Sequence, residues 1–245
     1  MKEISAFLIL GWGTISALHA QFNPANLVPE TLRYRMGSGS TDVGSSTITI
    51  SRDHAAGIIH IIESYSGLFE QTAAISLRND STLQMLNSHA VITRDNQYHE
   101  ARLKYHNNGR QITGAVRWPA AFGGTRVIDV ELPYSATDIY AVPHLFRATP
   151  LALNKTIRFH FFNVLQNEKG LARGWVSRLE TVTVPAGSFE CFRVEAYAGK
   201  TRLILNIDTQ FPHRVIRQIL PSLEIKFELA AVDKSDLLNE MSARH

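Results

Sequence analysis

The sequence predicts a mainly β protein, built as a single large curved antiparallel sheet (a half-barrel) with one or two short helices. Two observations carry this prediction. Apolar and polar residues alternate with a period of two through most of the chain, and turn signals separate the alternating runs. Such alternation is typical of strands with one buried face and one wet face. A sheet of about a dozen strands curls or closes rather than staying flat.

The clearest strand is predicted late in the chain, where Ile225, Phe227 and Leu229 face one way and charged residues face the other. Residues 47–51 and 128–132 alternate in the same manner. Glycine and asparagine supply the positive φ angles that tight turns need, and proline fixes a negative φ at the second turn position. The turns predicted on this basis are 107–109, 123–124, 184–187 and 198–200.

One segment, residues 137–147, has apolar residues at helical spacing and a capping residue at Thr137 or Asp138. It predicts a short helix that joins two halves of the sheet, and Pro143 is expected to kink or end it. Residues 70–86 fit a helix and a strand equally well.

Residues 1–20 predict an export signal: Lys2 precedes an apolar run that ends in small residues, with cleavage near Ala20/Gln21. The run is shorter than the roughly 20 residues a membrane span needs. No cysteine follows the cleavage site, so a lipoprotein is not expected. The mature chain, 21–245, is predicted to be one β-rich half-barrel domain, periplasmic or secreted. Its tail, 234–245, is expected to be a short helix or disordered.

Composition narrows the classes of partner. The formal net charge is +3, and the basic residues are scattered rather than clustered with aromatics. No nucleic-acid partner is therefore expected, although a weak attraction to anionic lipid head groups is compatible with this charge. Cys191 is the only cysteine, so no intramolecular disulfide forms. No histidine pair has metal-ligand spacing, and we expect no metal and no cofactor.

Two predicted strands, 57–62 and 157–162, are apolar on both sides. Such strands are covered on both faces, or one face lines a cavity. A buried imidazole needs a partner, so the histidines that interrupt these strands are candidate pocket residues. The candidate cavity lining is Ile59, His60, Ile61, Trp118, Phe159, His160, Phe161 and Trp175.

Catalysis has little support in the sequence. There is no Gly-x-Ser-x-Gly elbow. Cys191 lies inside a predicted strand, where a small packed thiol is the expected role although Arg193 shares its face. We therefore expect a protein without enzymatic activity, and no catalytic residue is assigned.

Residues 180–195, in which Val184-Pro185-Ala186-Gly187 is followed by Phe189, Cys191 and Val194, carry a resemblance. This stretch resembles uncharacterised exported proteins of Gram-negative bacteria that carry a domain of unknown function. Their fold is similar to that of the periplasmic lipoprotein carriers (LolA/LolB). The resemblance implies a highly curved half-barrel around a helix or an apolar ligand, and it implies no catalytic residues.

Together these observations favour a non-catalytic periplasmic carrier for a lipid-like or apolar ligand. The alternative is a structural or assembly protein of the envelope, without a small-molecule ligand and with an envelope protein as partner. A hydrolase is a minor alternative, which a contact between His60 or His160 and a carboxylate would favour.

Overall fold

A computed structural model describes residues 21–94 and 97–233. The described chain forms 15 strands in one open sheet, with a single α-helix and five short 3-10 helices. The predicted fold class is confirmed, with more strands than the dozen expected. The strands are β1 Glu30–Ser38, β2 Thr41–Asp53, β3 Ile58–Gly67, β4 Glu70–Arg78, β5 Met85–Arg94, β6 Gln97–His106, β7 Gln111–Arg117, β8 Thr125–Glu131, β9 Ala136–Asp138, β10 Thr156–Asn163, β11 Glu168–Val184, β12 Gly187–Ala198, β13 Thr201–Asp208, β14 Val215–Leu220 and β15 Ile225–Asp233.

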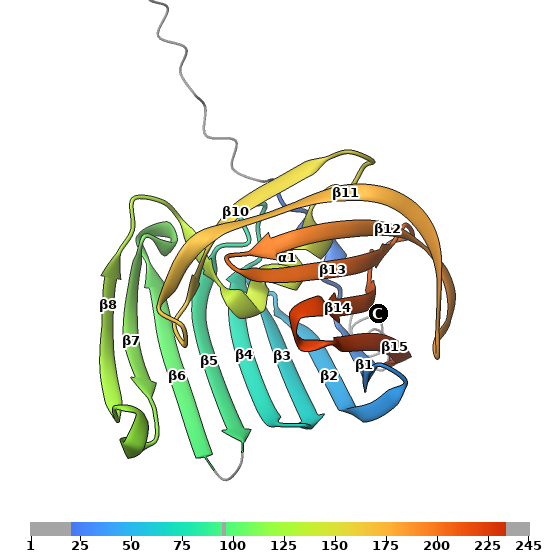
Figure 1. The fold of residues 1–245 in the computed structure, drawn as a ribbon. Helices are drawn as coiled ribbons and strands as arrows, with labels where there is room; N and C mark the ends of the chain where they lie inside the picture. The colour runs from blue at the N-terminus through green and yellow to red at the C-terminus, as the bar shows by residue number, and fades with distance from the viewer. Residues whose placement is uncertain (1–20, 95–96, 234–245) are drawn as a thin grey trace, which may run out of the picture.

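The first and last of the described strands pair in the middle of the sheet. β1 lies between β2 and β15, and Arg33 Nη2 lies 3.1 Å from Asp233 Oδ2 across the β1–β15 pair. On one side β2 to β8 follow one another as an antiparallel meander, the N-terminal limb. On the other side β15 leads back through successive neighbours to β10, the C-terminal limb, and β9 pairs with β10 at the edge of the sheet. Figure 1 shows the C-terminal limb curving over the N-terminal limb, so that the sheet encloses a concave interior.

Short turns connect neighbouring strands at the predicted places. The β6–β7 turn contains the 3-10 helix η2 (Asn107–Gly109), and the β7–β8 connection contains η3 (Ala120–Phe122) before its glycine pair. Asn108 has φ 58°, the left-handed conformation that asparagine tolerates better than most residues. The remaining 3-10 helices are η1 Pro24–Asn26, η4 Ile139–Ala141 and η5 Pro221–Leu223.

The helix α1, Val142–Ala148, confirms the short helix predicted between the two halves of the sheet. Pro143 lies in its first turn, where the missing N–H is harmless, so the prediction that Pro143 kinks or ends the helix is wrong. Asp138 does act as a cap, but for η4, accepting a hydrogen bond from the backbone N–H of Tyr140 at 3.1 Å. The ambiguous stretch 70–86 is β4, a turn and the start of β5.

The two strands predicted to be apolar on both sides differ in the structure. On β3, Ile59 and Ile61 are fully buried, but Ile62 is 46% exposed on the outer face. The expectation of two covered faces is therefore wrong for this strand. On β10, Phe161 and Phe162 are both fully buried although they point to opposite sides. They belong to different hydrophobic clusters, so β10 contacts the clusters of both limbs.

Candidate functional site

The concave interior holds one chain segment, 136–148, that connects the two limbs. It comprises β9, η4 and α1, and we call it the anchored segment. Six of the seven α1 residues are buried. Leu145 packs in the cluster of the N-terminal limb and Phe146 in that of the C-terminal limb, so the segment fills the space between both halves of the sheet. Figure 1 shows α1 within the curve of the sheet.

Asp138 provides the first polar contact between the anchored segment and the sheet. Its Oδ2 accepts hydrogen bonds from Ser88 Oγ on β5 at 2.7 Å and from Tyr105 OH on β6 at 3.0 Å. Burial raises the pKa of the Asp138 carboxyl, and these hydrogen bonds oppose the rise without cancelling it. The carboxyl therefore fixes the start of the segment against the N-terminal limb.

His144 provides the second contact. Its Nε2 lies 2.6 Å from Glu63 Oε1, and the side chains are only 4% and 6% exposed. The other carboxylate oxygen of Glu63 accepts a hydrogen bond from Tyr65 OH at 2.8 Å. Burial, followed by the charge of Glu63, raises the pKa of Tyr65 well above its usual value, so this phenol stays a donor.

Arg147 provides the third contact, with a fully buried carboxylate. Its Nη2 lies 2.6 Å from Glu30 Oε1 on β1, and Arg214 Nε lies 2.6 Å from the other oxygen of Glu30. Arg147 Nε also donates to the carbonyl of Pro212 at 3.2 Å, and Asn26 Nδ2 donates to the carbonyl of Arg147. This group of charges ties α1 to the central strands of the sheet.

These contacts position the segment more than they stabilise the fold. Taking an ion pair out of water costs several kcal/mol per ion, so well-packed apolar residues would do at least as well at the same place. Removing one partner is costly, because it leaves a buried charge unpaired. The polar contacts therefore select one placement of the anchored segment on an otherwise apolar concave face.

Two hollows lie near these elements. The first, about 20 Å³, lies between α1 and the central strands, with Glu63, His144, Arg147 and Phe227 among its lining residues. That volume suits a single water molecule. The second, about 250 Å³, is a shallow depression of the outer face of β2–β5, lined mostly by Ser and Thr hydroxyls and by Glu70.

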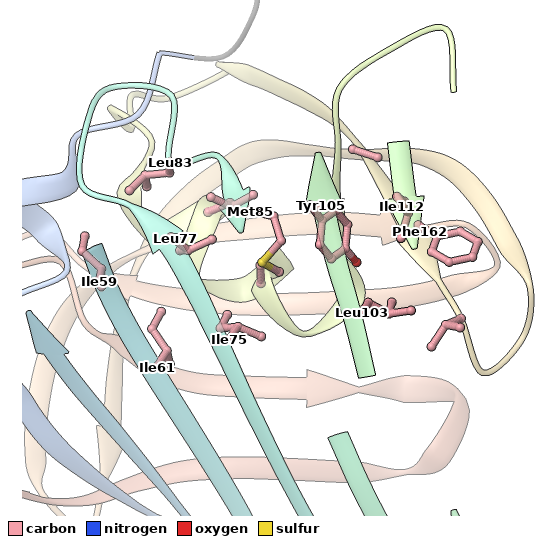
Figure 2. Close-up of a cluster of buried hydrophobic side chains, with 14 of the residues drawn as sticks. Ile59, Ile61, Ile75, Leu77, Leu83, Met85, Leu103, Tyr105, Ile112 and Phe162 are labelled. Carbon is pink, nitrogen blue, oxygen red and sulfur yellow. The ribbon is translucent and has the colours of Figure 1, made fainter. Parts of the chain in front are cut away.

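Three of the eight predicted cavity residues, Ile59, Ile61 and Phe161, are buried in packed core, and two more pack against it. Ile59 and Ile61 belong to the N-terminal cluster, and Figure 2 shows both among the interior side chains of that limb. Phe161 belongs to the C-terminal cluster, whereas Phe159 contacts both clusters. Trp118 packs at the edge of the N-terminal cluster, with its ring edge-to-face against His99.

The other three predicted residues belong to neither of these clusters. His60 Nδ1 lies 3.0 Å from Ser76 Oγ, and the His160 ring stacks on Tyr134 with centroids 3.7 Å apart. Trp175 is 38% exposed on the outer face of β11. None of the eight residues lines either hollow. Their part in ligand binding stays a prediction.

Sequence reasoning missed the buried charges. Glu63 shares a strand face with Ile59 and Ile61, and Glu30 shares one with Leu32. A carboxylate at a core-facing position of an alternating strand is the signal that could have revealed both. No comparable signal marks Arg147, because its partners Glu30 and Pro212 lie far away in the sequence.

The described residues contain no group of three or more side chains suited to hold a metal ion. Burial, with the nearby charges of Asp208 and Glu180, raises the pKa of the Cys191 thiol to about 12. A thiol held in its neutral form is a poor nucleophile. Within the described range, no helix is both apolar and long enough to span a bilayer.

Fold and site together define a single-sheet β protein with a charge-anchored segment in its concave face. The chain belongs to the family described as protein of unknown function (DUF3108), whose model matches residues 33–221. No curated protein matches it. A crystal structure from Bacteroides fragilis, described as a candidate exported protein with a YmcC-like fold, is 14% identical. That match covers 88% of this chain and 100% of the other, with a TM-score of 0.28. The likeness to lipoprotein carriers stays a prediction.

Proposed function

We propose that this chain is a non-catalytic binding protein of the bacterial envelope that carries an apolar, lipid-like molecule on the concave face of its sheet. One observation carries the proposal. The anchored segment, with its helix α1, packs into the apolar clusters of both limbs. A ligand that displaces this segment would gain the same apolar surface on two sides.

Side-chain contacts, more than strand pairing, hold the segment against the sheet. Asp138, His144 and Arg147 are held by side chains of β1, β3, β5 and β6. The strand pairing of the segment comprises the three residues of β9 against β10, and the backbone N–H of Asn23 donates to the carbonyl of Ala148 at 2.7 Å. Displacing the segment also leaves Glu30 and Glu63 without their partners on α1, which is costly. A ligand must therefore offset this loss as well as replace the packing of α1.

Native mass spectrometry of the mature protein, purified gently from a bacterial periplasm and then extracted with organic solvent, tests the proposal. A bound lipid-sized mass that extraction releases supports the carrier function. A ligand-free mass, with no uptake of added fatty acid or phospholipid, overturns it and favours the structural or assembly alternative.

A matched pair of variants tests the role of the anchored segment. Glu63→Gln weakens the contact with His144, whereas Glu228→Gln removes the same charge from an outer-face pair with Arg217. Uptake of a fluorescent fatty acid should rise in Glu63→Gln and stay unchanged in Glu228→Gln. Equal uptake by both variants and the wild type would contradict displacement of the segment.

A further inference from the structure

The outer face of the C-terminal limb brings together basic and aromatic side chains that lie apart in the sequence. Arg158 on β10 is the cross-strand partner of Arg173 on β11. Arg173 in turn faces Tyr197 on β12, which faces Arg202 on β13. Directly opposed residues of neighbouring strands share a face. These four residues therefore form one row across four strands, which we call the basic row.

The basic row has surplus positive charge. Arg158 and Arg173, both exposed, lie directly opposite each other. Like charges in this arrangement destabilise a sheet. Among the described residues, no carboxylate pairs with either guanidinium. Arg173 instead lies 6.0 Å from the ring centroid of Tyr197, and Arg202 Nη2 lies 2.9 Å from Glu195 Oε2. The Tyr197 ring thus offsets part of the charge of Arg173, but no described carboxylate neutralises the Arg158–Arg173 pair.

Large apolar side chains flank the row on the same face. Leu171 and Trp175 lie two residues either side of Arg173 and are 40% and 38% exposed. The Trp175 ring stacks on Tyr197 with centroids 6.2 Å apart. Lys169, also exposed, continues the pattern along β11. Single exposed apolar residues are ordinary, but here basic and apolar side chains alternate along one outward face.

We propose that this face of β10–β13 docks on the surface of an anionic lipid bilayer. Guanidinium groups bind phosphate with paired hydrogen bonds, which suits lipid head groups. Tryptophan and tyrosine favour the interface between apolar and wet regions of a membrane. The opposed arginines then find their counter-charge in the membrane. The inference does not depend on which molecule, if any, the concave face carries.

Co-sedimentation of the mature protein with phosphatidylcholine vesicles, with and without phosphatidylglycerol, tests the docking. Each basic residue near an anionic surface contributes about 1 kcal/mol, or about fivefold in affinity. Arg158→Gln/Arg173→Gln should therefore weaken binding by roughly 25-fold. Lys104→Gln/Arg117→Gln removes the same charge from exposed positions of β6 and β7 and should change binding less than twofold.

Fluorescence reports whether Trp175 enters the interface. Its emission should shift to the blue on adding phosphatidylglycerol vesicles, and Trp175→Phe should abolish the shift although Trp118 remains. Salt should weaken binding, since charges are screened over about 10 Å at 0.1 M. Equal binding to neutral vesicles, or equal loss in both double variants, overturns the proposal. Binding to dextran sulfate without a fluorescence shift on vesicles also overturns it, in favour of a soluble polyanion.

Thermal melts separate docking from folding. Arg158→Gln/Arg173→Gln should melt no lower than the wild type, because it relieves an opposed pair of like charges. A folded variant that no longer sediments with vesicles supports the proposal. If that variant melts far below the wild type, Arg158 and Arg173 have a structural role instead, and the assignment of this face to docking fails.

Discussion

The ring of Phe146 on α1 lies directly over Gly174 on β11: a Cβ atom at position 174 would lie 2.8 Å from Cε1 of that ring. The same Cβ atom would lie 3.1 Å from Cβ of Ala196 on β12. β11 thus contacts the anchored segment through a position without a side chain. Both Phe146 and Ala196 are fully buried, so neither can move aside cheaply.

Gly174→Ala should therefore destabilise the protein by about 1–3 kcal/mol, the usual cost of overpacking a core. Urea unfolding measures this change. Gly37→Ala is the matched control, because its added Cβ meets the flexible end of Lys226 at 3.1 Å. An unchanged midpoint in Gly174→Ala would show that α1 is free to shift on the sheet.

The buried pair of Glu63 and His144 gives a second prediction. Glu63→Ala leaves His144 without its carboxylate and Tyr65 without its acceptor, so a loss of about 3–5 kcal/mol is expected. A double-mutant cycle with His144→Ala measures the coupling directly. Additive losses, with no coupling, would contradict the role of this pair in holding α1.

Cys191 should be inert in the folded protein. The side chain is fully buried, and its thiol pKa of about 12 leaves little thiolate at neutral pH. An aromatic disulfide reagent should react with it only as fast as the protein opens, and at once in denaturant. Rapid labelling of the native protein, at a rate set by reagent concentration, would contradict this packing.

The strands could be predicted from the sequence because alternation is a local property. Ile225, Phe227 and Leu229, predicted to share a face, are all buried on β15. Alternation does not reveal which face of a strand turns inward. Trp175, a predicted cavity residue, is exposed on the outer face. The direction of a face depends on the curvature of the whole sheet.

The order of the strands could not be predicted, because pairing between distant strands leaves no local pattern. Residue 31 on β1 pairs with residue 233 on β15. The basic row also depends on strand pairing, since the register of β10 and β11 places Arg158 opposite Arg173. Scattered arginines in a sequence therefore do not exclude a charged surface in the fold.

The outer-face carboxylate Glu180 gives the pH prediction. Burial raises the pKa of Glu180, but hydrogen bonds from Asn206, Arg178 and Arg193 outweigh burial and leave the pKa below its usual value of 4.5. The bonds to Asn206 Nδ2 and Arg178 Nε are 2.6 and 2.8 Å long. A carboxyl whose pKa is depressed by folding stabilises the protein above its unfolded pKa.

That contribution should be present at neutral pH and lost as the pH falls below 4.5 through the folded pKa of Glu180. Glu180→Gln should therefore lower the melting temperature at neutral pH and flatten its fall on acidification. Melting curves from neutral pH to below 4.5 measure both effects, with the exposed Asp129→Asn as the control. Parallel curves for Glu180→Gln and the wild type would show that Glu180 titrates alike in the folded and unfolded chains.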